Sequence, residues 1–424
     1  MQFQDPKIFL KDKNKEVFAF FIISRIFAIY AATVFIADVE IYQQYAKNII
    51  EFKLTPYLDF DFFYQPLTLV PINLSAIFLS PIYYKEYLIV FSSMMLIFDF
   101  SCLAILRKYC LKRLHFDYGQ TNYMALIYSL LGLFLFALIY HRLEMISAFL
   151  LIISLLALGN LKSNRCIFLF LGLFGVFYNL IFLAAIPLLW ILWLFFISNK
   201  KIELLNKVLI KNLLIFISLF LVIMCFCDLI FSRKFLDSFI NQQQRGIDIQ
   251  STFGSILLLF NTFFKANFDV YYAFNSFNIN SGFLFFEILS KITLPFILLS
   301  FFSFLIHLKF KNKLKTKLDD KILIEGILTL LMIFASFSRV LTIEFLICLI
   351  PYLSIVLTYK NSKTFFISFV FIYVASSYLY NFNIMDLAAQ DHLKVSILFL
   401  RNLLITILSI LMIRSFFKQI ICFK

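Results

Sequence analysis

Charged side chains that could bind or activate a substrate stand at the ends of long apolar segments. Asp38 follows the apolar segment 17–37, and Arg142 and Glu144 stand where the segment 143–159 begins. A partly desolvated carboxylate can act as a general base toward a hydroxyl group, because burial raises its pKa. A guanidinium group can hold a phosphate through two parallel hydrogen bonds. The spacing therefore indicates acid–base and phosphate chemistry at a membrane boundary.

Further charges share this boundary, and Asp38 and Arg245 are the most informative of them. Asp38 stands at the junction of an apolar helix and an amphipathic segment, where it could meet lipid-borne and water-borne reactants. Arg245 precedes Gly246, and glycine lets the backbone approach a ligand closely. For any single charge, the simpler interpretation is a solvated loop residue. The full set is Asp38, Glu40, Asp59, Asp61, His141, Arg142, Glu144, Arg245, Asp248, Arg339 and Glu344.

The composition places these charges on a membrane protein. Of the 424 residues, 62% are hydrophobic and 15% are charged, and the mean hydropathy is +0.92. A soluble domain is about half apolar and about a quarter charged, so a soluble enzyme is excluded. Apolar runs long enough to cross the ~30 Å hydrocarbon core recur from end to end. The predicted fold is an all-α polytopic membrane protein, one domain over 1–424 with about twelve transmembrane helices.

The predicted spans alternate with short loops, and the loops on one side are basic. Most of the 38 Lys and Arg residues fall on that side, and cytoplasmic loops collect such residues. Both termini are therefore expected in the cytoplasm, with the other face toward the periplasm or exterior. Only 9 Gly beside 59 Phe is typical of AT-rich coding and favours a bacterial inner membrane. The spans are 17–37, 87–106, 120–139, 143–159, 166–180, 182–198, 212–231, 284–306, 322–338, 342–358, 364–381 and 393–413.

Two long segments lie on the outer side of this predicted membrane. Residues 38–86 begin with an amphipathic helix, in which Ile41, Tyr45, Ile49 and Phe52 recur at helical spacing, and such a helix is suited to the interface. The proline-rich stretch 65–81 is too short to cross, so we expect a helix that dips into the outer leaflet. The second segment, 232–283, contains an aromatic and Asn-rich part at 265–282 that predicts a hairpin.

Arg25, Asp99 and Arg401 are charges that fall well inside predicted spans. Arg25 lies 13 residues before Asp38, and Asp99 lies 12 residues after Tyr87. At about 1.5 Å per residue, both stand ~18–20 Å below the outer boundary. An isolated charge at that depth is costly, so we expect a buried Arg25–Asp99 pair, with a direct role toward substrate as the alternative. Arg401, in the last span, has no evident partner in the sequence.

Four segments, in order, resemble the polyprenol-phosphate-mannose-dependent mannosyltransferases, which belong to the multi-spanning GT-C superfamily (glycosyltransferase family 87). The family's first loop, D-x-x-x-Y … P-Y-x-D-F … E-Y-P-P-L, is similar to Asp38-Val-Glu-Ile-Tyr, Pro56-Tyr57-Leu-Asp59-Phe and Tyr64-Gln-Pro66-Leu67. Its R-[FY]-D element resembles Arg142-Leu-Glu144, and its R-G-L-Q-I-E-S loop resembles Arg245-Gly246-Ile-Asp-Ile-Gln250-Ser251. Its F-S-P-Q-Y … L-P boundary resembles Ser336-Phe-Ser338-Arg339 and Leu349-Ile350-Pro351.

The resemblance implies a GT-C-like fold and an inverting transfer of a sugar, mannose in that family, on the non-cytoplasmic face. The expected partners are a polyprenyl-phosphate sugar donor, a glycan or lipid acceptor and membrane lipids. Asp38 would be the general base, and Arg245 and then Arg142 would stabilise the leaving phosphate. Glu40 and Glu144 would orient these arginines or bind sugar hydroxyls, and Tyr64 would stack on a sugar. Gln250 and Arg339 complete the expected substrate-binding set, and no metal or cofactor is expected.

The chain differs from the family pattern at five positions. Phe63 and Gln65 stand where the first loop has glutamate and proline. Glu144 replaces aspartate, Gln250 replaces glutamate, and Arg339 replaces proline. An inactive relative is the alternative that these substitutions favour.

A secondary transporter or lipid flippase is the other alternative, since twelve spans with inner termini suit it. However, the sequence shows no internal repeat and few of the glycines that break transporter helices. The net charge of +14 forms no basic face for nucleic acid, which is not expected as a partner.

Overall fold

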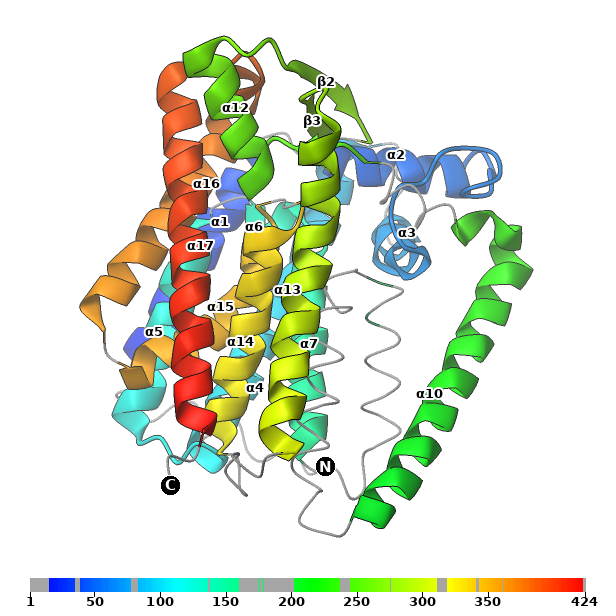
Figure 1. Ribbon diagram of the computed structural model, residues 1–424. Helices are drawn as coiled ribbons and strands as arrows, with labels where there is room; N and C mark the ends of the chain where they lie inside the picture. The colour runs from blue at the N-terminus through cyan, green and yellow to red at the C-terminus, as the bar shows by residue number, and fades with distance from the viewer. Residues whose placement is uncertain are drawn as a thin grey trace.

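The computed structural model shows a bundle of long helices with smaller elements gathered at one end (Figure 1). The predicted spans 166–180 and 182–198 lie outside the described residues, apart from Gly175 and Tyr178. The structure describes residues 15–34, 39–77, 83–135, 138–159, 175, 178, 202–236, 245–274, 276–310, 319–340, 343–360 and 362–421.

Helices occupy the other predicted spans. Five of those described are long and apolar enough to cross a membrane. They are α1 (Lys15–Val34), α4 (Tyr84–Lys112), the Leu284–Leu308 part of α13 (Leu284–Phe310), the Lys363–Tyr380 part of α16 (Lys363–Ala388) and α17 (His392–Ile420). Further apolar helices accompany them, namely α5 (Tyr118–Phe134), α7 (Glu144–Gly159), α10 (Ile202–Phe231), α14 (Asp320–Phe337) and α15 (Phe345–Lys360). The described part of the chain is thus built as a helical membrane protein.

Two helices differ from the predicted bounds in an informative way. The span predicted at 120–139 is divided, because α5 ends at Phe134 and a separate short helix, α6 (Leu138–His141), follows before α7. Helix α10 begins at Ile202 instead of 212, since the basic segment before the apolar run consists mainly of Leu, Lys and Glu, which are good helix formers. The hydropathy pattern of the sequence therefore predicts neither a break inside an apolar run nor the extension of a helix beyond it.

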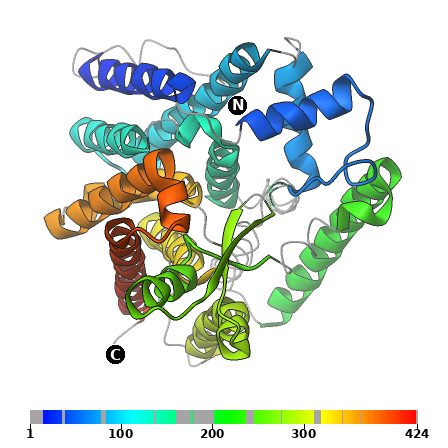
Figure 2. The same cartoon turned by 90° about the horizontal axis from the view of Figure 1, so that it is seen from above.

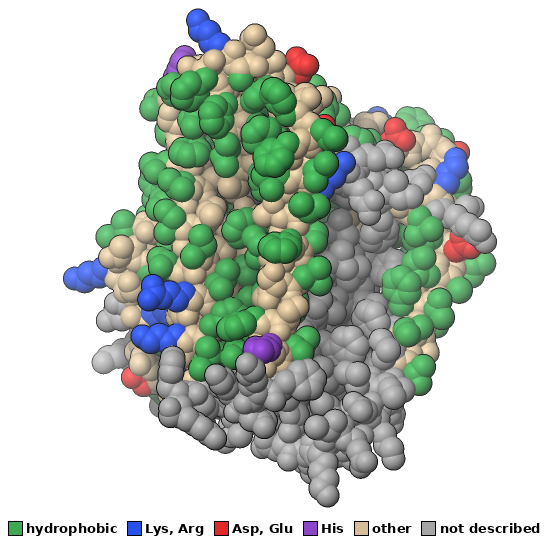
Figure 3. Space-filling model, viewed as in Figure 1, with side chains coloured by type: hydrophobic (Ala, Val, Ile, Leu, Met, Phe, Trp, Pro, Cys, Tyr) green, Lys and Arg blue, Asp and Glu red, His purple; other side chains and the backbone are tan. Residues whose placement is uncertain are grey.

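Helices α14 and α15 form the centre of the bundle. Side chains on all sides of both helices are buried, as expected for helices that are apolar all round. Helix α14 packs against α15 and α17, and α15 packs against α5 and α7. The outward side chains of α13 and α17 are mainly apolar and exposed (Figure 3), which is the surface that lipid requires. Several Lys and Arg side chains gather near the lower end of this face.

Helices α2 (Val39–Ile50) and α3 (Leu69–Ile77) pack against each other toward the upper end of the bundle (Figure 1), and the outer, interfacial position expected for 38–86 stays a prediction. The C-terminal end of α17 lies at the opposite end. The α2 face that packs on the protein contains Val39, Tyr42 and Tyr45, whereas Phe52 is exposed, so the predicted apolar stripe is only partly the buried one. This end of the bundle, with α2, α3 and the strands described next, is called the α2 end.

A small antiparallel sheet lies at the α2 end, and it adds one strand to the hairpin that the sequence predicts at 265–282. Strands β2 (Asp269–Ala273) and β3 (Ser276–Asn280) form the predicted hairpin, and β1 (Ile247–Asp248) pairs with β3. Seen from above, the strands lie between α12 (Thr252–Phe264) and α13 on one side and α2 on the other (Figure 2). Phe274 at the hairpin tip packs edge-on against Phe63, with ring centroids 5.8 Å apart. The two long loops of the sequence therefore meet.

Candidate functional site

Residues 140–144 connect α6 to α7 and are held by several distant parts of the chain; we call them the α6–α7 turn. The Tyr140 hydroxyl donates to Asp99 Oδ2 on α4 at 2.8 Å. His141 Nε2 lies 2.7 Å from the carbonyl oxygen of Ala32 on α1. Two backbone carbonyl groups of the turn are also bound: Leu143 O accepts from Tyr178 Oη, and Glu144 O accepts from Cys348 Sγ. The position of Arg142 within this turn is therefore closely defined.

The guanidinium group of Arg142 is buried between Glu344 and Tyr380. Its Nη1 lies 3.2 Å from Glu344 Oε1, and its Nη2 donates to Tyr380 Oη at 2.6 Å. Burial by itself lowers the pKa of an arginine, but the Glu344 carboxylate and the Tyr380 hydroxyl outweigh it and raise the pKa of Arg142. Arg142 is therefore a cation in a region where little water screens it, which favours strong binding of an anion.

A second carboxylate, that of Glu144, accompanies Glu344 beside this arginine. Glu144 interacts electrostatically with both Glu344 and Arg142. In each glutamate the Oε2 atom is enclosed and has no hydrogen-bond partner among the described residues. An enclosed carboxylate oxygen is costly unless a donor reaches it. Both atoms can therefore accept hydrogen bonds from hydroxyl groups of a ligand.

Tyr42 and Tyr64 bring the first long loop to the same place. Tyr42 donates a hydrogen bond to Tyr64, and their rings pack edge-on with centroids 5.5 Å apart. Burial is the main cause that raises the pKa of both hydroxyls well above the usual value, and the charges of Glu144 and Glu344 add to it. The two tyrosines are neutral hydrogen-bonding groups, and the Tyr64 ring packs among aromatic neighbours.

A second group of charges is built on β1 and the loop before α15. Asp248 N donates to Arg339 O at 3.0 Å, and Arg339 Nε donates to Gly246 O at 3.4 Å. Arg245 Nη2 donates to Ser276 Oγ on β3 at 2.9 Å. Burial and, to a smaller extent, the charge of Arg245 lower the pKa of Arg339, so two guanidinium groups lie in one neighbourhood. This pair is suited to an anion with more than one charged oxygen.

Gly246 is needed for the hairpin to close over this loop. A Cβ atom there would lie 2.3 Å from the Tyr271 hydroxyl and 2.8 Å from Asn278 Cβ. The sequence suggests that Gly246 admits a ligand to the backbone, but the structure fills that space with β2 and β3.

Asp248 connects the two groups of charges. Its side chain is buried, Oδ1 accepts from Gln250 N at 2.8 Å, and Oδ2 is enclosed without a partner in the described part of the chain. Burial raises the pKa of Asp248 to about 7, against the opposing charge of Arg245, and Glu344 raises it further. The influence of Glu344 indicates that both groups share one polar region. Near neutral pH the Asp248 carboxyl can therefore either accept or donate a proton.

Gln250 links this loop to α17. Its carbonyl oxygen accepts from Arg401 Nη2 at 2.7 Å and from Asn402 Nδ2 at 3.0 Å. Arg401, for which the sequence offers no partner, thus finds a backbone acceptor and the Asn402 side chain. The Gln250 Oε1 atom is enclosed and accepts no hydrogen bond from any residue that the structure describes, so a ligand-binding role would depend on that atom.

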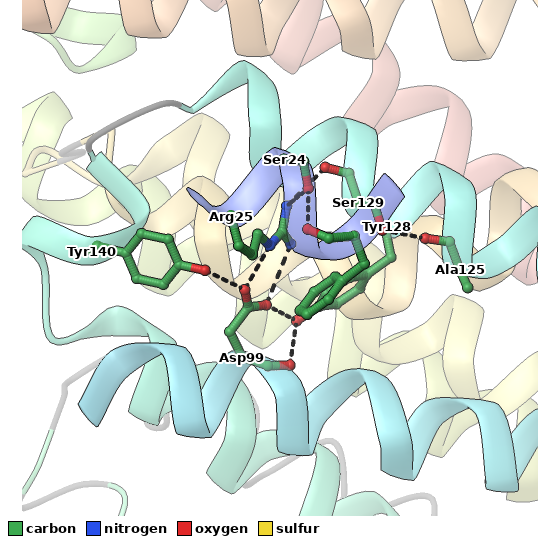
Figure 4. Close-up of polar contacts among 8 residues, drawn as sticks. Ser24, Arg25, Asp99, Ala125, Tyr128, Ser129 and Tyr140 are labelled. Carbon is green, nitrogen blue, oxygen red and sulfur yellow. Dashed lines mark hydrogen bonds and ion pairs between the residues drawn. The ribbon is translucent and has the colours of Figure 1, made fainter. Parts of the chain in front are cut away.

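The predicted Arg25–Asp99 pair is confirmed and forms the centre of a separate network (Figure 4). Arg25 Nε lies 2.7 Å from Asp99 Oδ2, and the Tyr128 and Tyr140 hydroxyls donate to the two oxygens of Asp99. Arg25 Nη1 donates to Ser129 O at 2.8 Å. A Cβ atom at Gly132 would lie 2.5 Å from Arg25 Nη2, so this glycine makes room for the guanidinium group. Both carboxylate oxygens already have partners, which favours a structural role.

Most of the predicted site residues fall into two adjoining groups in the structure, and Glu40 and Asp38 stand apart from them. Tyr64, Arg142 and Glu144 converge at the α6–α7 turn, and Arg245, Gln250 and Arg339 form the adjoining group, as described above. Glu40 is exposed and acts on Tyr84, and its expected role toward an arginine or toward sugar hydroxyls stays a prediction. Asp38 lies outside the described residues, although Val39, which follows it, begins α2 one turn before the buried Tyr42.

Glu344 and Asp248 join the site although the sequence suggests no special role for them. Both belong to the set of boundary charges, and each lies within five residues of a motif arginine, which was the one available signal. Within the described ranges, no group of three or more His, Cys, Asp and Glu side chains could hold a metal ion. No protein-family model matches the chain, and no curated protein matches it.

Proposed function

We propose that the protein is a GT-C-type inverting hexosyltransferase with about twelve transmembrane helices. It transfers a sugar, mannose in the family that its sequence resembles, from a polyprenyl-phosphate donor to a lipid- or glycan-linked acceptor. The reaction takes place at the α2 end, which faces away from the cytoplasm. The observation that supports this most is the buried cluster of Arg142, Glu144 and Glu344, with Tyr42 and Tyr64 of the first loop beside it.

The donor has an isoprenoid tail and a charged phosphate, and the α2 end offers a partner for each. The helices present exposed apolar side chains toward lipid, while Arg142 is buried at the cluster and Arg245 and Arg339 lie beneath the hairpin. Guanidinium groups bind phosphate oxygens and stabilise the charge that develops on a leaving phosphate. The three arginines therefore account for the binding of a lipid monophosphate without another cation.

The transfer is a single displacement at the anomeric carbon. The acceptor oxygen forms a bond to that carbon while the bond to the phosphate oxygen breaks, and the bonding electron pair leaves with the lipid phosphate. The acceptor proton passes to the carboxylate of Asp38, the proposed general base. The enclosed oxygens of Glu144 and Glu344 accept hydrogen bonds from sugar or acceptor hydroxyls, which orients the reactants.

The activity is tested with the purified protein in lipid nanodiscs. The donor is a radiolabelled polyprenyl-phosphate mannose, and the acceptor is the lipid extract of a strain that lacks the gene. The wild-type protein is expected to transfer label, and Asp38→Asn to lose about 100-fold or more in rate. Asp61→Asn removes an exposed carboxyl from the same loop and serves as the matched control. Full activity of Asp38→Asn at wild-type protein level would reject Asp38 as the base, and donor uptake into liposomes without turnover would favour a transporter.

The sidedness is tested with a cysteine at Gln44, an exposed residue of α2. The seven native cysteines are first replaced, and intact cells are then treated with a membrane-impermeant maleimide. Labelling in intact cells is expected, because the α2 end is proposed to face outward. Labelling only after the membrane is opened would place the site in the cytoplasm and reject the proposal.

A further inference from the structure

We propose that Tyr140 is a positioning residue for Arg142, and that the buried Arg25–Asp99 pair serves the site through it. The inference rests on the proposed function, because Arg142 is one of the groups assigned to the donor phosphate. Tyr140 donates to Asp99 at 2.8 Å, and Arg142 follows two residues later. A network in the interior of the bundle is thereby joined to the cluster at the α2 end.

The short helix that carries Tyr140 cannot hold its own position. Helix α6 has four residues, and a helix of that length has no independent stability. The contacts of its side chains with the rest of the protein therefore determine where it lies. Successive side chains of the α6–α7 turn point to three different parts of the protein: Tyr140 to α4, His141 to α1, and Arg142 to Glu344 and Tyr380.

Of the two anchors that precede Arg142, Tyr140 is the stronger. Burial lowers the pKa of His141 to about 4, so its ring is neutral, and its one described hydrogen bond goes to a backbone carbonyl. The Tyr140 hydroxyl instead donates to a buried carboxylate that also pairs with Arg25. Hydrogen bonds to a charged group contribute about twice as much as those between neutral groups. Loss of the Tyr140 hydroxyl should therefore loosen the turn more than loss of the histidine contact.

The network also supplies a matched control, Tyr128. Its hydroxyl donates to the other oxygen of the same carboxylate, Asp99 Oδ1, at 2.7 Å. Tyr128 lies in α5, outside the α6–α7 turn. Tyr128→Phe and Tyr140→Phe thus each remove one hydrogen bond from the same buried carboxylate. Tyr128→Phe also removes a contact of 3.3 Å to the Asp99 carbonyl oxygen, and only Tyr140→Phe removes a bond that holds the turn with Arg142.

The experiment measures the Kd for a polyprenyl monophosphate, and KM and kcat for the polyprenyl-phosphate mannose donor, on both variants in nanodiscs. Tyr140→Phe is expected to raise Kd about tenfold, as for the loss of one charge-assisted hydrogen bond, and to lower kcat/KM by about tenfold or more, because Arg142 also stabilises the leaving phosphate. Tyr128→Phe is expected to leave all three within about twofold, although both variants lower the midpoint of thermal unfolding to a similar degree.

A second measurement asks whether Tyr140 acts through Arg142. In an Arg142→Lys background, Tyr140→Phe should raise Kd less than about twofold, because coupled residues give non-additive effects. Equal changes in Kd for the two tyrosine variants, or a full tenfold effect in the Arg142→Lys background, would overturn the inference. Failure of the wild-type protein to transfer sugar would reject the proposed function, and the Kd comparison would still decide the role of Tyr140.

Discussion

Arg25 and Arg142 are both buried beside a carboxylate, yet their surroundings differ in one respect. Around Arg25, both oxygens of Asp99 accept hydrogen bonds, from Arg25 itself and from two tyrosines. Around Arg142, one oxygen of Glu344 pairs with the guanidinium group and the other is enclosed without a described partner. A further carboxylate, Glu144, lies next to that pair. The first network has matched charges, and the second has one carboxyl group more than its ion pair needs and two enclosed acceptor oxygens without a described partner.

This difference separates a structural ion pair from a candidate binding site. A buried pair with all its hydrogen bonds satisfied is destabilised strongly when one partner is removed. A cluster with enclosed, unsatisfied acceptors has free energy to gain from a ligand that brings donors. Substitutions that break the Arg25–Asp99 pair itself should therefore act mainly on stability, and substitutions in the second cluster mainly on ligand binding, with Tyr140 as the residue that connects the two. The following predictions test that division, beginning with the largest expected effect.

Asp99→Ala should destabilise the protein by about 3–5 kcal/mol, because it leaves the Arg25 charge buried without a counterion. The midpoint of thermal unfolding in detergent measures the effect. Asp386→Ala is the control, since Asp386 is exposed and pairs with Lys394, and surface pairs contribute less than about 1 kcal/mol. Equal losses in the two variants would show that the Arg25 network is not the stronger one.

Glu144→Gln should have the opposite signature. The change keeps the shape of the side chain and removes its repulsion from Glu344, so the midpoint of unfolding should stay the same or rise. The kcat/KM for sugar transfer should fall about 10- to 100-fold, because an amide replaces a carboxyl group that binds ligand hydroxyls. A variant that loses stability but keeps its activity would place Glu144 in the structural class with Asp99.

Gly132→Ala should destabilise the protein by about 1–3 kcal/mol, as expected for overpacking in a filled core. The new Cβ would lie 2.5 Å from Arg25 Nη2, which must then move from Asp99. Gly119→Ala in the same helix is the control, because its new Cβ would meet a side-chain oxygen of Asp117 at 3.2 Å. If circular dichroism shows equal unfolding midpoints for the two variants, the packing around Arg25 is looser than described.

Asp248→Asn should change how stability depends on pH. The pKa of Asp248 is raised from 3.8 to about 7 by burial, so the folded protein holds this proton more tightly than the unfolded chain. The stabilisation from this group is full below pH 4 and is lost as the pH rises through 7. Wild-type and variant midpoints should therefore agree near pH 4, and the variant should be more stable at pH 8. Parallel curves from pH 4 to 8 would show that the Asp248 pKa is not raised.

The sequence predicts contacts that follow from counting residues along helices. Arg25 and Asp99 could be paired because each helical residue adds a fixed rise, which places both charges at one depth. The hairpin at 269–280 could be predicted because its signals are local to one segment. The resemblance of four segments to a known family also identifies Arg142 and Arg245 as candidate site residues.

The sequence does not predict contacts that depend on which helices are neighbours. Glu344 meets Arg142 because α15 packs against α7, and no local pattern records that packing. Asp248 is buried because β1, only two residues long, joins a hairpin that begins some twenty residues later. Phe63 stands where the family pattern has a glutamate, and in the structure its ring packs against Phe274 at the hairpin tip. Such positions are set by tertiary structure, so a single sequence carries little signal for them.

The anchoring of residues 140–144 has a consequence for how a bulky lipid would reach the proposed site. A guanidinium group that is tethered through the backbone to α1, α4 and α15 is in place before any substrate arrives, so little reorganisation of its charge is needed during turnover. Under the proposed function, an isoprenoid would then enter away from this turn, and the contact between the Phe63 and Phe274 rings, with centroids 5.8 Å apart, is one place where the two long loops could separate.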